Sequence, residues 1–131
     1  MALSLGMIRA DIAMARYALN DYISNKKNKD IKNMCAYHIQ QAAEKLIKYQ
    51  IYQKMPSPNN KEMYTHNLGA LLKYASRENI RVKVPKYIQE NLEIITGWEA
   101  GSRYDLHFSI RIDTLKKALA VVCEWYSDFA T

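Results

Sequence analysis

The sequence predicts an all-α protein, folded as a single-domain up-and-down helical bundle of about five helices over residues 1–131. Three observations predict this class. The chain of 131 residues has the length of one domain, and its hydrophobic fraction of 49% is enough for a core. Only four glycines and three prolines interrupt the chain. Apolar residues recur at alternating spacings of three and four residues, which is the pattern of amphipathic helices.

The first two predicted helices are the longest. The polar and basic stretch 24–30 separates them as a turn, and Asp30 is expected to cap the second helix. Residues 4–24 carry one apolar stripe: Leu5, Ile8, Ile12, Ala15, Leu19 and Tyr22. Residues 31–54 carry a line of Ala36, Ile39, Ala43, Leu46 and Gln50, which Ala42, Ile47 and Ile51 widen.

Three shorter helices are expected after a proline-rich and asparagine-rich loop at 54–65. Thr65 is expected to cap the first, which runs to about Ser76 and buries Leu68, Leu71, Leu72 and Ala75. A connection at 76–85 precedes the next, in which Pro85 takes the first turn and Gly101 the end. That helix presents Ile88, Leu92, Ile95 and Trp98, and the last presents Leu115, Leu119, Val122, Tyr126 and Phe129.

The charge and the cysteines narrow the classes of function. The net charge of +6 favours anionic partners, with nucleic acids and nucleotides first among them. Cys35 and Cys123 lie far apart without metal-ligand spacing, and we interpret both as small buried residues of a reducing compartment. Arg9 and Asp11 interrupt the only early apolar patch, so we expect a cytoplasmic protein without a membrane segment. We expect no metal site and no cofactor.

A polar stripe lies along the second predicted helix. It consists of His38, Gln41, Lys45 and Lys48, again at spacings of three and four residues. Such a stripe is typically a solvated face. An interior network or an interface is the alternative, because Gln41 and Glu44 flank the small pair Ala42 and Ala43, where another helix can approach closely. His66 follows Thr65 at a helix start, where an exposed histidine or a nearby anion are both reasonable interpretations.

The stretch GSRYDLHFSIR, residues 101–111, holds the best candidates for chemistry. If residues 103–107 are helical, Arg103 and His107 share a face. Arginine holds a phosphate and stabilises its developing charge, and histidine moves a proton, so the pair suffices in principle for metal-independent RNA cleavage. In the alternative interpretation Arg103 pairs with Asp105 or Glu99, and Tyr104 packs inside.

Three segments resemble the HEPN family (higher eukaryotes and prokaryotes nucleotide-binding). AYHIQQAAEKLIKYQI resembles its long second helix, THNLGALL a following Thr-His-x-Leu-x-x-Leu helix, and SRY a Ser/Ala-Arg-Tyr segment before the last helix. The resemblance implies a helical bundle, often a homodimer, that associates with nucleotides or RNA. Small prokaryotic members are often encoded beside a minimal nucleotidyltransferase as a toxin–antitoxin pair.

The resemblance also decides between two functions. Nuclease members place four to six residues between the Arg and the His, whereas three separate Arg103 from His107 here. We therefore expect a nucleotide- or RNA-binding and interaction module, with a metal-independent endoribonuclease toxin that uses Arg103 and His107 as the alternative. The binding or interface candidates are Arg103, Tyr104, Asp105, His38, Gln41, Lys45, Lys48 and His66.

Overall fold

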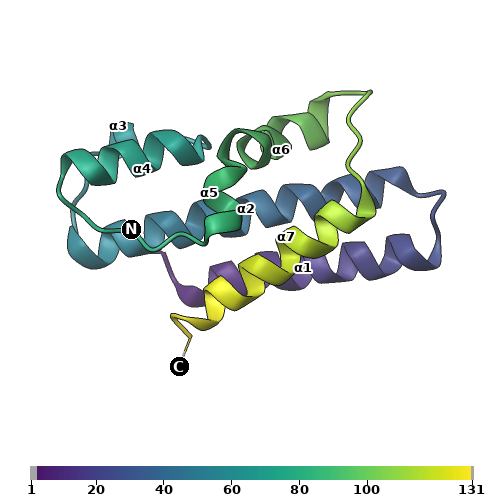
Figure 1. The fold of residues 1–131 in the computed structure, drawn as a ribbon, viewed down its shortest axis with the longest axis horizontal. Helices are drawn as coiled ribbons and strands as arrows, with labels where there is room; N and C mark the ends of the chain where they lie inside the picture. The colour runs from purple at the N-terminus through teal and green to yellow at the C-terminus, as the bar shows by residue number, and fades with distance from the viewer. Residues whose placement is uncertain (1–2, 131) are drawn as a thin grey trace.

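The structure is a computed structural model that describes residues 3–130, and seven helices with no strand run along that part of the chain (Figure 1). They are α1 (Leu5–Ser24), α2 (Lys29–Lys54), α3 (Asn60–Met63), α4 (Leu68–Arg77), α5 (Lys86–Glu90), α6 (Leu92–Tyr104) and α7 (Ile112–Ser127). The all-α class and the helical bundle are confirmed. None of these helices is long and apolar enough to cross a membrane.

The predicted count of five helices is wrong for two reasons. The short α3 lies within the predicted loop, where the Asn59 side chain accepts hydrogen bonds from the first backbone N–H groups. The helix expected after Pro85 is divided at Asn91 into α5 and α6. The Asn91 side chain donates to the carbonyl of Tyr87 at 2.8 Å, so it competes with the helical backbone at that point.

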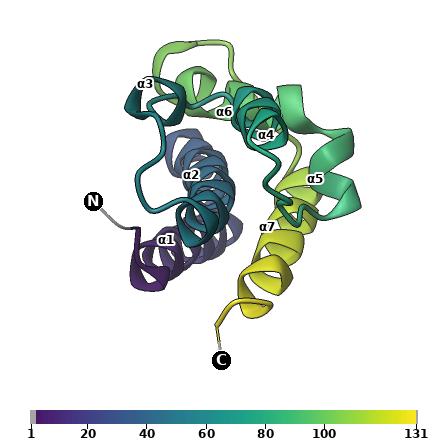
Figure 2. The ribbon, with the colours of Figure 1, turned by 90° about the vertical axis from the view of Figure 1, so that its left-hand side faces the viewer.

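Helix α2 forms the centre of the bundle and packs against α1, α4, α6 and α7 (Figure 2). Its apolar line explains this position, because Ala36, Ile39, Ala43 and Leu46 are all fully buried. Gln50 ends the same line, and its side chain accepts from the backbone N–H of Lys83 and donates to the carbonyl of Lys83. A buried amide therefore fixes the connection before α5 against α2. Several outer positions of the predicted stripes are half-buried against this core: Leu5, Leu72, Leu92, Tyr126 and Phe129. Tyr22 is also half-buried, and Lys32 lies over its ring.

Two predicted caps are wrong by a few residues. Asn28, not Asp30, caps α2 by accepting from the N–H of Ile31. Asn67, not Thr65, caps α4 by accepting from the N–H of Ala70. Short polar side chains all make good caps, so the backbone path into the helix decides which of them does so. The Thr65 hydroxyl instead accepts from the N–H of Asn67.

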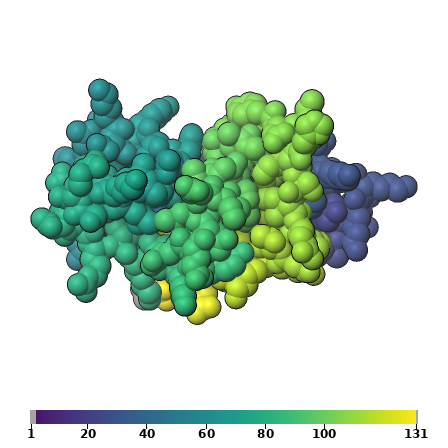
Figure 3. All heavy atoms as spheres, turned by 45° about the horizontal axis from the view of Figure 1, so that its top comes forward, coloured from purple at the N-terminus to yellow at the C-terminus, as the bar shows by residue number. Residues whose placement is uncertain are grey.

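Gly101 does not end α6, which continues to Tyr104 with Asp105 as its C-cap. A Cβ atom at Gly101 would lie 2.7 Å from a ring carbon of Phe108. The glycine therefore lets the segment after α6 fold back onto the helix. Figure 3 shows α6 and this segment, in green and yellow-green, side by side on one face, while the α1–α2 turn in blue projects at one end.

Two glycines of α6 allow a test of this close approach. Gly97→Ala should raise the free energy of unfolding by about 0.5–1 kcal/mol, because nothing lies within 4 Å of its Cβ position and alanine is the better helix former. Gly101→Ala should lower it by about 1 kcal/mol, because overpacking against Phe108 exceeds the same helical gain. Urea unfolding followed by circular dichroism measures both changes. Equal stabilisation by the two variants would show that Phe108 moves aside without cost.

Candidate functional site

The candidate site is built around the carboxylate of Glu44, which lies in the middle of α2 with 4% of its surface exposed. Three hydrogen bonds compensate its burial. Gln40 donates through Nε2 at 3.2 Å, Lys48 through Nζ at 2.9 Å, and Nδ1 of His66 lies 2.9 Å away. Gln40 and Lys48 are one helical turn before and after Glu44, so α2 itself supplies two of the three partners.

The same network continues from α2 to α6. Nε2 of His66 lies 3.6 Å from a carboxylate oxygen of Glu99, which forms an ion pair with Arg103. The Nε group of Arg103 also donates to the carbonyl of Glu99 at 3.1 Å. Gln40 donates to the carbonyl of His66 at 2.9 Å. The network therefore holds α2, the residues before α4 and the end of α6 in one arrangement.

A second carboxylate, Asp11 of α1, organises the predicted polar stripe. Asp11 is 7% exposed, and it binds Nδ1 of His38 at 2.9 Å and the Lys45 ammonium. Gln41 donates to Oε1 of Gln40 at 2.8 Å. The expectation of a solvated face is wrong, because the side chains of His38, Lys45 and Lys48 keep only 16%, 22% and 16% of their surface exposed.

Sequence reasoning missed Asp11 and Gln40. Asp11 interrupts an otherwise apolar face of α1, and a charge at a core-facing position of an amphipathic helix signals a buried partner. Gln40 is fully buried and has no such signal, because it lies beside the predicted stripe instead of on it. Gln41 lies on the predicted stripe, whereas the small alanines beside Glu44 are the only signal for that residue.

Arg103 lies at the end of α6, with its guanidinium carbon 5.1 Å from the ring centre of Tyr37 and 4.8 Å from that of Tyr104. Of the two carboxylates considered as its partners, Glu99 is the one that it binds. The alternative in which Tyr104 packs inside is wrong, because 74% of Tyr104 is exposed. The Arg103 side chain has 36% of its surface exposed and is bound to Glu99, so it is both held in place and accessible.

Arg103 and His107 do not share a helical face. Helix α6 ends at Tyr104, and the Asp105 carboxylate accepts from the backbone N–H of His107 at 2.9 Å. This bond closes a turn in which His107 is exposed. The condition under which the pair would line up on one helix is therefore not met.

The described residues also include potential metal ligands and two thiols. Glu44 and Glu99 bind opposite nitrogens of His66 and so do not converge on one ion, and residues 3–130 contain no cluster suited to a metal. Cys35 is fully buried, and this burial raises the pKa of its thiol to about 12. Cys123 is only half-buried, contrary to expectation, and its sulfur accepts a hydrogen bond from Arg16.

The sequence model of the HEPN domain matches residues 9–127. The chain therefore belongs to the HEPN domain family, which confirms the resemblance. HEPN domains generally serve nucleotide- or RNA-related functions. Comparison with curated proteins and with solved structures gave no match.

Replacing Glu44 should destabilise the whole bundle. Glu44→Gln keeps the shape of the side chain but turns an NH2 group toward donors, so we expect the free energy of unfolding to fall by about 1–3 kcal/mol. Urea unfolding measures the loss. Glu124→Gln is the matched control on the exposed face of α7 and should change the value by less than about 0.5 kcal/mol. Equal values for the two variants would exclude a structural role of the Glu44 network.

Proposed function

We propose that this protein is a nucleotide- or RNA-binding and interaction module that works as a homodimer. The observation that carries the proposal is the guanidinium of Arg103, held between the rings of Tyr37 and Tyr104 and one-third exposed. Arginine beside aromatic rings binds phosphates through its edge, while the rings stack on bases. The net charge of +6 adds a general attraction for such ligands.

Arg103 retains donors for a ligand in spite of its ion pair. A guanidinium has five N–H groups, and the described residues accept two of them, both at Glu99. A phosphate can therefore bind the remaining edge without displacing Glu99. Tyr104, at 74% exposure, offers the ring on which a base can stack next to that phosphate.

The homodimer is supported by apolar side chains near this site. Met14, Tyr17 and Met34 are exposed by 50%, 63% and 39%. The antiparallel register of α1 and α2, in which Asp11 meets His38 and Lys32 covers the Tyr22 ring, sets Met14 and Tyr17 opposite the first half of α2. A dimer through this face would bring two copies of Arg103 toward one shallow groove.

We extend the proposal to a protein partner, a minimal nucleotidyltransferase, and to a role in a toxin–antitoxin pair. Small HEPN proteins are often paired with a minimal nucleotidyltransferase in a toxin–antitoxin system, and the three matching motifs of this chain support the same pairing. Membership of the family is the basis of this extension. Co-purification with such an enzyme encoded nearby is the direct test.

A metal-independent endoribonuclease that uses Arg103 and His107 is the second candidate. The observation in its favour is that Arg103, which is one-third exposed, is followed directly by a turn carrying the exposed His107. One RNA strand could contact both side chains. Arg103 lies in α6 and His107 lies in the turn after it, so the two side chains do not share a helical face. This arrangement favours binding over cleavage.

Removing Arg103 should weaken RNA binding in a manner that identifies a phosphate contact. We expect Arg103→Ala to reduce the affinity for a labelled RNA pool about tenfold. The slope of log affinity against log salt should become shallower by about 0.7, which corresponds to one phosphate of a single strand. Tyr104→Ala should reduce affinity without changing the slope, because stacking releases no counterion. Fluorescence anisotropy at several salt concentrations measures both quantities.

Arg77→Ala is the matched control for this experiment. Arg77 also pairs with a carboxylate, Glu62, and also lies over a tyrosine ring, that of Tyr74, but at the end of α4. Equal losses for Arg77→Ala and Arg103→Ala would indicate general electrostatic attraction and contradict the proposed site. The same RNA, incubated in EDTA, tests the nuclease: cleavage that both Arg103→Ala and His107→Ala abolish would establish the second candidate instead.

A charge on the outer face of α1 should dissociate the homodimer. Met14→Glu is expected to convert the wild-type dimer to a monomer in analytical ultracentrifugation, because it places a carboxylate in the apolar contact. Ile94→Glu is the control, since Ile94 is 59% exposed and lies two and a half turns from Arg103, on the opposite face of α6. A monomeric wild type, or dissociation by Ile94→Glu alone, would contradict this interface.

A further inference from the structure

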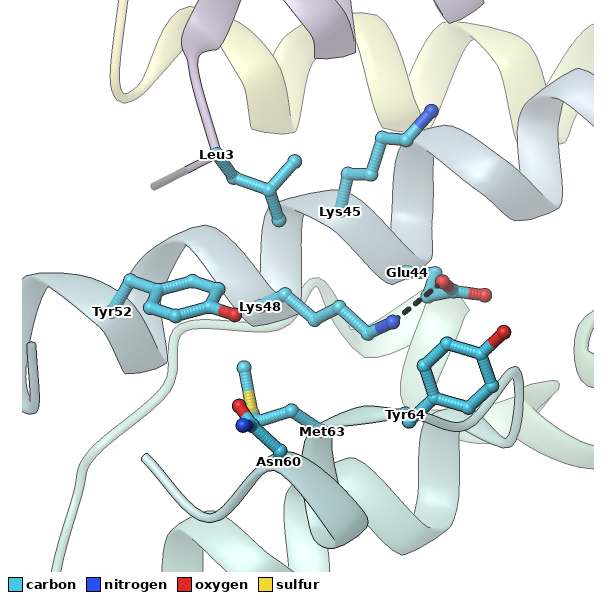
Figure 4. A pocket seen from close by; sticks show the side chains of 8 residues that line it. All are labelled: Leu3, Glu44, Lys45, Lys48, Tyr52, Asn60, Met63 and Tyr64. Atoms are coloured by element: carbon cyan, nitrogen blue, oxygen red, sulfur yellow. Dashed lines mark hydrogen bonds and ion pairs between the residues drawn. The ribbon is translucent and has the colours of Figure 1, made fainter. Parts of the chain in front are cut away.

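A pocket lies apart from Arg103, between the second half of α2 and the segment from α3 to Tyr64 (Figure 4). Its volume is about 270 Å³. Figure 4 shows the Lys48 side chain extending from beside Tyr52 toward Glu44 and Tyr64, with Met63 and Asn60 below it. The residues that line it are Leu3, Glu44, Lys45, Lys48, Tyr52, Asn60, Met63 and Tyr64.

The wall opposite α2 presents an aromatic ring that makes little contribution to folding. Tyr64 is 93% exposed, so its ring buries almost no area in the protein. Met63, which precedes it in the chain, also lines the pocket, although only 4% of its surface is exposed. An exposed ring and an apolar side chain in one pocket suit a planar heterocycle, because base stacking on tyrosine is favourable for every base.

The α2 wall of the pocket carries two ammonium groups, each paired with a buried carboxylate. Lys45 binds Asp11 and Lys48 binds Glu44. The Lys48 ammonium has three N–H groups, and the described residues accept one of them, at Glu44. A second hollow of about 140 Å³ shares Lys48 and Tyr64 and extends to Thr65 and His66. An anion in this second hollow could accept hydrogen bonds from the two N–H groups of Lys48 that Glu44 does not use.

We propose that this pocket binds a single nucleotide unit, with its base against Tyr64 and Met63 and its phosphate at the Lys48 ammonium. The size supports no more than one unit, because the pocket volume lies just below the range of about 300–1,000 Å³ that is usual for small-molecule pockets. The inference rests on the proposed function and deepens it, since it assigns the nucleotide to a place that shares no residue with the Arg103 surface. A free mononucleotide and the terminal nucleotide of an RNA have the same chemistry here.

Nuclear magnetic resonance of labelled methionine methyl groups tests the proposal. AMP, GMP, CMP and UMP are titrated separately, with inorganic phosphate as the anion control. A base stacked in the pocket should shift the Met63 methyl resonance upfield through its ring current. The methyl of Met14, exposed on α1, should not move. Phosphate alone should leave Met63 unshifted.

Two variants locate the binding. Tyr64→Ala and Lys48→Met should each weaken the nucleotide titration at least about tenfold, which corresponds to the loss of one stacked base or one charged hydrogen bond. If Lys48→Met does not fold, Tyr64→Ala still tests the pocket, because a ring that is 93% exposed can be removed without loss of packing. Ile94→Ala removes another exposed apolar side chain, on α6 and outside both the pocket and the proposed dimer face, and should leave the titration unchanged.

The outcomes separate this inference from the proposed function. A Met63 shift that Tyr64→Ala abolishes and Arg103→Ala preserves would support the pocket. Nucleotide binding that neither Tyr64→Ala nor Lys48→Met weakens would overturn the pocket and leave the proposed function intact. The same conclusion would follow if no mononucleotide bound while Arg103→Ala still reduced the affinity for RNA. If the wild-type protein bound neither mononucleotides nor RNA, both the pocket and the proposed function would be overturned. A pentanucleotide RNA that shifts Met63 more strongly than the mononucleotides would identify a chain end as the occupant.

Discussion

The arrangement of the bundle depends on the burial of one carboxylate. Taking an unpaired carboxylate out of water costs several kcal/mol, so Glu44 is tolerated in the middle of α2 only where donors surround it. Helix α2 supplies Gln40 and Lys48, and the remaining donor is His66, just before α4. The start of α4 is thereby fixed over α2. Because His66 also faces Glu99, the same requirement positions α6.

Glu99 links this buried network to Arg103 at the surface. It is 7% exposed and binds Arg103 through both its side chain and its carbonyl, so the guanidinium has a defined orientation at the end of α6. An arginine held in this way loses less conformational entropy when it binds a phosphate than a freely moving one does. In the proposed function the interior network would therefore serve recognition at Arg103, although Glu44 and His66 lie away from that phosphate.

The sequence predicted the helices far better than it predicted their ends or their contacts. Periodicity located α1, α2, α4 and α7, because burial of one face is the dominant energy and leaves a regular pattern. The cap at Asn67 and the end of α6 beyond Gly101 depend on where the chain travels next, which periodicity does not record. In the candidate site, the sequence pattern predicted the polar stripe. It could not predict that Asp11 binds His38, because the two residues are 27 positions apart in the chain.

The proposed pocket and the Arg103 surface share no residue, yet one chain of polar contacts joins them. It runs from Lys48 through Glu44, His66 and Glu99 to Arg103. A phosphate that drew Lys48 away from Glu44 would leave that buried carboxylate with fewer donors, and its interaction with His66 would strengthen in compensation. His66 would then interact less with Glu99, and Glu99 would hold Arg103 more tightly. Two ligands at the ends of such a chain would affect each other's affinity, and by thermodynamic linkage the effect would be equal in both directions.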